Sequence, residues 1–299
     1  MARVLVTGSS GFVGRYLVRA LRKLGHEVFP LDLIKGFENE TSVDITDINE
    51  VSNLVSQVKP EVVIHLAAQV DVLKSLVDPK NDLLTNGIGT LNIIEAAFIN
   101  GCKNFCYIHS GGAIYDSNAN LPLNERSAEL PQSPYGLTKN LAEGYVRIFA
   151  EKNGSQWSSL ALSNCYGPID EHGRGVIYNF AKALSSGTTP AIYGKDVTRD
   201  FVFVSDVVDA ICLAISNPTN MRVNISSDSE TSLLELYFEI AREMGDISVK
   251  PIIEEPKFGE IRRSRLSNLL AQEIMGWRPK IELSKGLRLS LSGKYSDNE

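Results

Sequence analysis

Hydrophobic positions along the first two thirds of the chain follow two alternating patterns. Short runs rich in valine, isoleucine and leucine predict strands, and between them apolar residues recur at helical spacing. The predicted strands span residues 3–6, 28–33, 62–66, 105–109 and 159–163, and the predicted helices span residues 14–24, 51–58, 83–99 and 134–151. Strands that are apolar on both sides and alternate with helices indicate a parallel sheet covered on both faces.

The pattern changes after residue 168, where turn residues become frequent. They gather at residues 170–175, 185–190 and 217–220, which indicates a smaller, loop-rich region over the carboxyl edge of the sheet. We therefore expect an α/β fold: a Rossmann-like doubly wound parallel sheet with a smaller C-terminal substrate-binding region. The expected domains are residues 1–167, to which a segment at about 200–226 returns, and residues 168–299, which mainly bind substrate.

Composition narrows the class of protein. The 299 residues are 43% hydrophobic and 22% charged, enough to bury a substantial core, and the net charge of −6 argues against nucleic acid or an anionic membrane as a partner. The cysteines and histidines show no metal-ligand spacing, so we expect free thiols and no metal. Residues 1–8 are predicted to form a strand rather than a signal peptide, and no apolar run is long enough to cross a bilayer. A soluble, cytoplasmic protein is expected.

A glycine-rich turn follows the first predicted strand. In Thr7-Gly8-Ser9-Ser10-Gly11-Phe12-Val13-Gly14, the glycines allow a tight turn, close approach of a pyrophosphate and close packing of the next helix. The amides at the start of that helix favour a bound diphosphate. Asp32 stands at the tip of the next strand, where a carboxylate binds ribose hydroxyls and repels a 2′-phosphate. The pattern favours NAD over NADP.

A second group of residues predicts proton transfer. Ser133 and Pro134 are typical of a helix start, and they place Tyr135 and Lys139 one turn apart on the same face. A tyrosine, with an ordinary pKa of about 10, acts as a base only when a nearby positive charge favours its phenolate. Ser110 ends the fourth predicted strand, at the edge where open α/β sheets bind ligands. A Tyr-x-x-x-Lys pair alone is common on helices. Ser110 and the glycine-rich turn are what favour a catalytic role for this one.

Together these motifs resemble the extended short-chain dehydrogenase/reductases of the NAD-dependent epimerase/dehydratase family, in the pattern of its nucleotide-sugar 4-epimerases. The resemblance runs from Thr7 to about Gly286. Its motifs follow in the family's order: Thr7-Gly8-x-x-Gly11-Phe12-x-Gly14, Asp44-Ile45, His65-Leu66-Ala67-Ala68-Gln69, Asn86-Gly87-x-Gly89-Thr90, the Ser110 segment, Ser133-Pro134-Tyr135-Gly136-x-x-Lys139, Asn164-x-Tyr166-Gly167-Pro168, Arg199-Asp200-Phe201-Val202 and Gly276-Trp277-x-Pro279.

The resemblance implies roles for individual residues. The catalytic residues would be Ser110, Tyr135 and Lys139. The cofactor-binding residues would be Gly8, Ser10, Gly11, Phe12, Val13, Gly14, Asp32, Asp44, Ile45, Leu66, Ala67, Ala68, Gln69, Asn86, Tyr135 and Lys139, with Asp44 and Ile45 at the adenine and Asn86 supporting the pocket. The substrate-binding residues would be Ser110, Gly111, Tyr135, Asn164, Val176, Tyr193, Arg199 and Arg262, with Asn164 and Arg199 on the diphosphate and Tyr193 against the base.

Three positions depart from the family's pattern. His109 replaces a usual serine or threonine, Asp116 a usual glycine, and Ala161 a usual arginine. His109 either tunes the site or is a strand-end histidine hydrogen-bonded to backbone.

The resemblance implies an NAD-dependent nucleotide-sugar 4-epimerase whose expected substrate is a UDP-hexose. A 4,6-dehydratase carries an Asp-Glu pair after the catalytic hydroxyl, where this chain has Gly111, Gly112 and Ala113, so that alternative is weaker. A 4-ketoreductase needs the same three catalytic residues and stays open. From another class, a catalytically silent regulatory protein that binds NAD and nucleotide sugar is the remaining alternative.

Apolar residues on the two long predicted helices also exceed what one sheet face needs. They are Leu84, Ile88 and Leu91 on the first helix, and Tyr145, Ile148 and Phe149 on the second. The resemblance implies that part of this surface forms a four-helix interface in a homodimer.

Overall fold

The computed structural model describes residues 1–37, 40–169, 173, 175–245, 249–255 and 261–292, and its centre is a seven-stranded sheet. The strands lie in the order β3-β2-β1-β4-β5-β6-β11, and neighbours pair in parallel. Their bounds are β1 (Arg3–Thr7), β2 (Glu27–Asp32), β3 (Thr41–Ser42), β4 (Val62–His65), β5 (Asn104–Ser110), β6 (Gln156–Leu162) and β11 (Arg222–Ile225). Because strand order reverses between β1 and β4, this is the doubly wound sheet that the sequence predicts.

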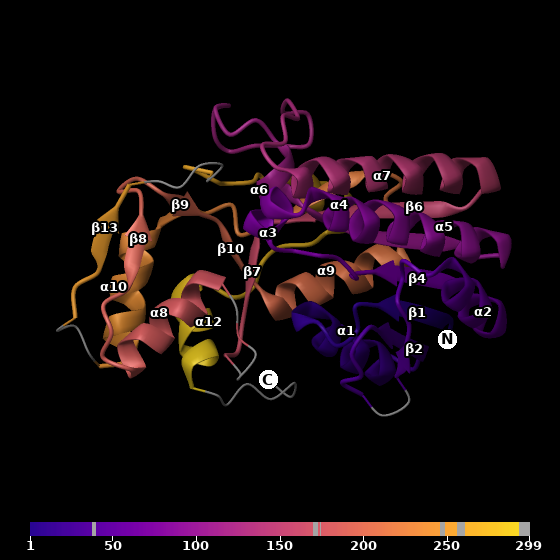
Figure 1. Ribbon diagram of the computed structural model, residues 1–299, viewed down its shortest axis with the longest axis horizontal. Coiled ribbons are helices and arrows are strands. Elements are labelled where there is room, and N and C mark those ends of the chain that lie inside the picture. The colour runs from indigo at the N-terminus through magenta and orange to yellow at the C-terminus, as the bar shows by residue number, and fades with distance from the viewer. Residues whose placement is uncertain (38–39, 170–172, 174, 246–248, 256–260, 293–299) are drawn as a thin grey trace.

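Helices cover both faces of the sheet, as Figure 1 shows. One face packs against α1 (Phe12–Lys23) and α9 (Val204–Ser216), and the other against α2 (Ile48–Val58), α5 (Thr90–Ile99) and α7 (Pro134–Asn153). Each layer has its own apolar core, centred on Val6, Leu17 and Val207 on the first face and on Phe105, Ile93 and Val146 on the second.

The helix predicted over residues 83–99 is longer and less regular than the sequence indicates. After the short helix α3 (Val72–Val77), the chain forms α4 (Pro79–Asp82), a π-helical segment η1 (Leu83–Gly89) and then α5 without interruption. Asp78 caps the start of α4 by accepting a hydrogen bond from the Asn81 amide. A π-helical turn inside an α-helix is frequent at functional sites, and η1 carries Asn86.

The remaining elements form a smaller layer at the left of Figure 1. Its helices α8 (Gly175–Ser185), α10 (Leu233–Glu243) and α12 (Leu283–Leu291) enclose a core that contains Phe180, Phe203 and Tyr237. Its short strand pairs are β7 (Asn164–Tyr166) with β10 (Phe201–Phe203), β9 (Thr198–Arg199) with β12 (Thr231–Ser232), and β8 (Ala191–Tyr193) with β13 (Ile252–Glu254). Helices α6 (Gly111–Ile114) and α11 (Leu269–Met275) complete the described elements.

The chain crosses between the two layers more than once. Helix α9 packs on α1, and β11 joins the main sheet beside β6, whereas β10, at the start of the segment predicted to return, pairs with β7. The domain boundaries stay predictions, and most of the turn-rich stretch at residues 170–175 lies outside the described residues.

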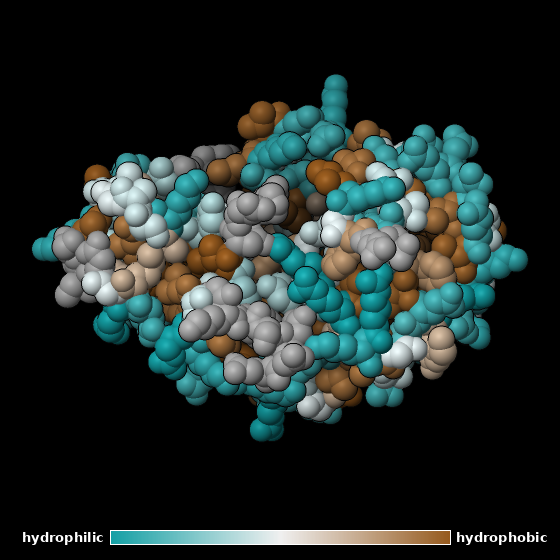
Figure 2. Space-filling model, turned by 90° about the horizontal axis from the view of Figure 1, so that it is seen from below, coloured by the Kyte–Doolittle hydropathy of each residue, from teal (hydrophilic) through white to brown (hydrophobic). Residues whose placement is uncertain are grey.

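The surface, the lengths of the helices and the state of the cysteines add three findings. Hydrophilic and hydrophobic residues are interspersed on the face shown in Figure 2. Within the described ranges, no helix is long and apolar enough to cross a membrane. The four cysteines are free and lie buried or half-buried.

Candidate active site

The glycine-rich turn lies at the point where strand order reverses. Gly8 has a φ of +71°, and a Cβ there would lie 2.6 Å from the amide nitrogen of Ala67, which follows β4. A Cβ on Gly14 would lie 2.2 Å from the Gly8 carbonyl oxygen, so α1 packs directly on the turn. Gly11 caps α1 without a side-chain hydrogen bond. The start of α1, which no side chain caps, fits a diphosphate beside this turn.

A buried histidine fixes the strand that faces this turn. The Thr90 hydroxyl donates to the Asn86 carbonyl, so its oxygen accepts from His65 Nε2 at 2.9 Å, and His65 Nδ1 accepts from Thr7 at 2.7 Å. Burial, with a smaller effect of the Lys139 charge, lowers the pKa of His65 to about 3, so the ring is neutral. His65 thus braces β1, β4 and α5, and holds the segment at residues 66–68 at the sheet edge.

Two carboxylates lie beside the turn. Asp32 accepts from the Ser10 amide at 3.0 Å, as expected for a residue at the tip of β2. Glu40, which the sequence analysis missed, is buried and accepts from the hydroxyls of Ser9 and Ser10 and from the Phe37 amide. Burial by itself raises its pKa, but these hydrogen bonds together hold the pKa below its usual value. Two negative charges here oppose a 2′-phosphate and fit NAD.

The predicted adenine residues stand further along this edge. Asp44 is exposed and its carboxylate caps the turn at Thr46, whereas Ile45 is buried against Gly89 of η1.

Gln69 and Asn86 form a closed pair. The Asn86 side chain accepts from the Gln69 amide at 2.8 Å and donates to the Gln69 carbonyl at 2.9 Å. The Gln69 side chain donates to the Asp71 carbonyl and to Asp82. Both amide groups are therefore used inside the protein, and they fix the backbone after β4.

Helix α7 begins as the sequence predicts. Ser133 caps it by accepting from the Gly136 amide at 3.2 Å, Pro134 is its first residue, and Tyr135 and Lys139 lie one turn apart. Its start is pressed against α6, because a Cβ on Gly136 would lie 2.2 Å from the Ala113 carbonyl oxygen.

The three predicted catalytic residues come together at the carboxyl end of β5. The Ser110 side chain lies within reach of the Tyr135 hydroxyl, whose pKa it lowers. Lys139 is buried, donates to the Ile108 carbonyl at 2.7 Å and lies 4.2 Å from the centre of the Tyr107 ring.

Burial dominates the pKa of both ionisable groups. It raises the pKa of Tyr135 to about 12, opposed by the hydrogen bond from Ser110 and reinforced by the charge of Asp82. It lowers the pKa of Lys139 to about 7, opposed by the charges of Asp82 and Glu143. A positive charge arriving beside Tyr135 favours its phenolate.

His109, the first departure from the family pattern, is bonded to backbone. Its Nδ1 accepts from the Ser110 amide at 2.8 Å, so Nε2 carries the proton and donates to Asn140 at 3.1 Å. Asn140 also accepts from Arg222, which forms a buried ion pair with Glu143. Burial lowers the pKa of His109 well below its usual value, with the charge of Arg222 as the next cause.

The other two departures are structural. Asp116 caps a turn by accepting from the Asn118 amide, and Ala161 is buried in β6.

The predicted substrate residues are spread over the second layer. Asn164 is exposed on β7, and Arg199 on β9 donates to the Ile261 carbonyl at 2.7 Å. Arg262 lines a cavity of about 250 Å³ together with Gly194, the residue after Tyr193. Val176, near the start of α8, packs against the core of this layer. These residues follow Ser110 in the sequence by more than 50 positions, and all of them belong to the second layer, beside the edge of the sheet.

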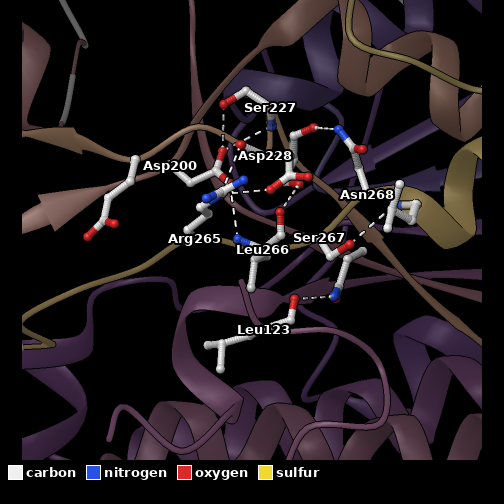
Figure 3. Close-up of polar contacts among 12 residues, drawn as sticks. Leu123, Asp200, Ser227, Asp228, Arg265, Leu266, Ser267 and Asn268 are labelled. Carbon is white, nitrogen blue, oxygen red and sulfur yellow. Dashed lines mark hydrogen bonds and ion pairs between the residues drawn. The ribbon is translucent and has the colours of Figure 1, made fainter. Parts of the chain in front are cut away.

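A polar junction around Asp200 and Leu266 joins this layer to the segment at Leu123 (Figure 3). The buried carboxylate of Asp200 accepts from the amides of Ser227 and Leu266 at 2.9 and 3.1 Å. Ser226 donates to the Leu266 carbonyl, and the backbone on either side of Leu266 pairs with Leu123. The Leu266 side chain fills the space beside the Gly111 backbone, where a Cβ would lie 2.3 Å from Leu266 Cδ1.

Comparisons with known proteins agree with this geometry. Residues 4–226 match the model of the NAD dependent epimerase/dehydratase family. A UDP-glucose 4-epimerase of Mycolicibacterium smegmatis is 37% identical over 95% of this chain and 96% of its own length. The UDP-glucose 4-epimerase of Thermotoga maritima, solved with UDP-glucose, superposes with a TM-score of 0.92 at 33% identity over 97% of both chains. That of Thermus thermophilus, solved with NAD, has a TM-score of 0.88 at 31% identity, and the match covers 97% of this chain and 98% of the other.

The chain belongs to the NAD-dependent epimerase/dehydratase family. The expected fold class and NAD as cofactor are confirmed. The residue roles stay predictions.

Proposed function

We propose that the chain is a nucleotide-sugar 4-epimerase in which Tyr135 is the acid-base residue. The observation that carries this proposal is the placement of Ser110 beside Tyr135 and buried Lys139 at the carboxyl edge of the sheet. The UDP-glucose 4-epimerases among its relatives support the same reaction and favour a UDP-hexose as substrate.

In the proposed reaction, Tyr135 takes the proton of the sugar 4-hydroxyl while Ser110 hydrogen-bonds the same oxygen. NAD, held at the glycine-rich turn, would supply the hydride-transfer chemistry at C4 through which the configuration of this carbon is inverted. Tyr135 then gives its proton back, so the product differs from the substrate only in configuration. Lys139 stabilises the phenolate between the two transfers.

Asn164 and Arg199 are the proposed diphosphate contacts. A guanidinium suits phosphate oxygens because its donors form a planar fork. Arg199 now bonds carbonyls of its own chain, at Thr198 and Ile261, so substrate binding would exchange backbone partners for phosphate oxygens.

The reaction is tested by proton NMR of the protein with NAD and UDP- or dTDP-linked glucose, galactose and their N-acetylated forms. We expect one sugar to convert to its 4-epimer without accumulation of NADH. Tyr135→Phe abolishes this conversion, whereas Tyr145→Phe, on the exposed side of the same helix, leaves it unchanged. A 4-keto sugar that accumulates would favour a dehydratase or reductase, and NAD binding without turnover of any sugar would favour a silent binding protein.

We also propose that the protein is a homodimer. Leu84 and Ile88 on η1 and Leu141 and Ile148 on α7 are each 45–51% exposed, and the two helical segments pack side by side. Leu91 and Phe149 are partly buried and contribute less. Light scattering at micromolar concentration tests the dimer: Ile148→Asp should give a monomer, and Leu269→Asp, equally apolar and exposed on α11, should not. A monomeric wild-type protein would contradict the proposal.

A further inference from the structure

Asp82 is a fully buried carboxylate for which the proposed reaction has no role. It ends α4, immediately before the π-helical segment, and none of its side chain is exposed. Its Oδ1 accepts from Gln69 Nε2 at 3.0 Å and from Asn86 Nδ2 at 3.1 Å, and its Oδ2 accepts from the Thr138 hydroxyl at 2.6 Å. All three donors are neutral, and no ion pair to Asp82 is found within the described part of the chain.

The three donors connect the two halves of the active site. Gln69 and Asn86 fix the backbone after β4, at the cofactor edge. Thr138 stands on α7 between Tyr135 and Lys139, and its hydroxyl also lies 3.1 Å from the Tyr135 carbonyl oxygen. The Asp82 carboxylate therefore connects α4 and the segment after β4 to α7, the helix that carries Tyr135 and Lys139.

A buried charge without an ionic partner is costly unless a nearby opposite charge balances it. The charged or titratable groups around Lys139 come from four elements: Asp82 from α4, Glu143 and Tyr135 from α7, Tyr107 and His109 from β5, and His65 from β4. Glu143 is already paired.

Glu143 pairs with Arg222, both side chains being 11% exposed, and Arg222 also pairs with the more exposed Glu129. Among the described residues, Asp82 is thus the buried carboxylate near Lys139 that has no ion pair of its own.

We propose that Asp82 is a positioning residue that holds the Gln69–Asn86 pair against α7 and supplies the buried counter-charge for Lys139 and for the positively charged nicotinamide ring. When Tyr135 is a phenolate, the two positive groups, Lys139 and the oxidised cofactor, are balanced by two negative ones, Tyr135 and Asp82. The cofactor part of this proposal rests on the NAD dependence of the family; the pH part rests on the proposed epimerase reaction.

Asp82→Asn removes the charge while the hydrogen bonds can be kept. The amide oxygen still accepts from Gln69 and Asn86, and the new NH₂ donates to the Thr138 oxygen, whose proton turns to the Tyr135 carbonyl. We therefore expect a cooperative thermal melt close to that of the wild type. Asp82→Ser is the second charge-free variant, to be used if Asp82→Asn does not melt cooperatively.

The first readout is the position of the pH profile. Burial sets the pKa of Tyr135 and of Lys139, and the Asp82 charge raises both. The rate rises as Tyr135 ionises and falls as Lys139 loses its proton, so removing the charge shifts both limbs of kcat/KM to lower pH, by about 0.5 unit or more. Asp78→Asn, an exposed change that keeps the cap of α4, leaves the profile in place.

The second readout needs no sugar and separates failure of this proposal from failure of the proposed reaction. Titration calorimetry gives the affinities of the oxidised and the reduced cofactor, which differ in charge at the nicotinamide ring. We expect Asp82→Asn to weaken NAD⁺ relative to NADH by about threefold or more, and Asp78→Asn to leave the ratio unchanged.

Thr138→Val separates charge from hydrogen bonding, because it removes one donor to Asp82 and keeps the carboxylate. It should lower kcat without moving the limbs of the profile. The proposal is overturned if the charge-free variants keep both the wild-type limbs and the wild-type cofactor ratio, or if Thr138→Val shifts the limbs as far as Asp82→Asn does.

Discussion

Gly111 and Leu266 form a contact whose energetics a double-mutant cycle can measure. A Cβ on Gly111 would lie 2.3 Å from Leu266 Cδ1 and 3.2 Å from the Ala161 carbonyl oxygen. Leu266 cannot move as a whole, since its amide donates to Asp200 and its carbonyl accepts from Ser226. Gly111→Ala should therefore lower the free energy of unfolding by about 1–3 kcal/mol, the usual cost of overpacking.

Leu266→Ala alone should cost about 2–5 kcal/mol, because the side chain is fully buried and leaves a cavity. In the double variant the new methyl group at position 111 enters that cavity. The two losses should then fall short of additivity by about 1–2 kcal/mol. Urea unfolding of the wild type and the three variants measures this coupling.

The kcat values of the same four proteins should show the same coupling, because Gly111 directly follows Ser110. A displacement of the catalytic hydroxyl should lower kcat of Gly111→Ala by about tenfold or more, and Leu266→Ala should restore part of it. Gly112→Ala is the matched control, since its Cβ would meet only Ser264 Oγ, at 3.8 Å, and its stability should stay within about 0.5 kcal/mol of the wild type. Additivity within about 0.3–0.5 kcal/mol would refute this reasoning.

Three further changes test other parts of the site. Gly136→Ala places a Cβ 2.2 Å from the Ala113 carbonyl oxygen, a backbone atom, so urea melts should show a loss of about 1–3 kcal/mol and assays a lower kcat; unchanged kcat would show that the start of α7 need not touch α6. Glu143→Ala leaves Arg222 with Glu129 as an ion-pair partner and should therefore cost about 1–3 kcal/mol in the same melts, whereas a loss above about 3 kcal/mol would mean that Glu129 does not compensate the guanidinium. Burial raises the pKa of Asp200 to about 6 from 3.8, so its contribution to stability is present below about pH 4 and is lost as pH rises through 6. The free energy of unfolding should therefore fall by on the order of 3 kcal/mol between these pH values in the wild type and not in Asp200→Asn. Equal slopes of stability against pH in both proteins would contradict this prediction.

The parts of the site that could be predicted from the sequence are those in which neighbours along the chain make the geometry. Ser133, Pro134, Tyr135 and Lys139 lie within one helix start, and local capping rules place them correctly. The glycine-rich turn is similar in part, because the positive φ of Gly8 and the contact of Gly14 with the Gly8 carbonyl lie within the turn.

The parts that could not be predicted depend on residues far apart in the sequence. Glu40 is an ordinary loop glutamate by its neighbours, and only the folded turn brings Ser9 and Ser10 to its carboxylate. Asp82 and Thr138 are 56 positions apart, and each is unremarkable in its own helical pattern. The sequence also indicated one regular helix over residues 83–99, because a π-helical turn shifts the register without changing which residues are apolar.

The junction in Figure 3 also changes what the residues after Ser110 mean for the reaction. In the sequence, Gly111 counted against a dehydratase because it lacks an acidic group. In the structure, position 111 has no room for any side chain, since Leu266 and the carbonyls of Ala161 and Leu162 occupy that space. An acid at this position would therefore require a different course of the segment around Leu266, which Asp200 holds in place. The residues that can follow Ser110, and with them the reaction proposed there, thus depend on a segment more than 150 residues further along the chain.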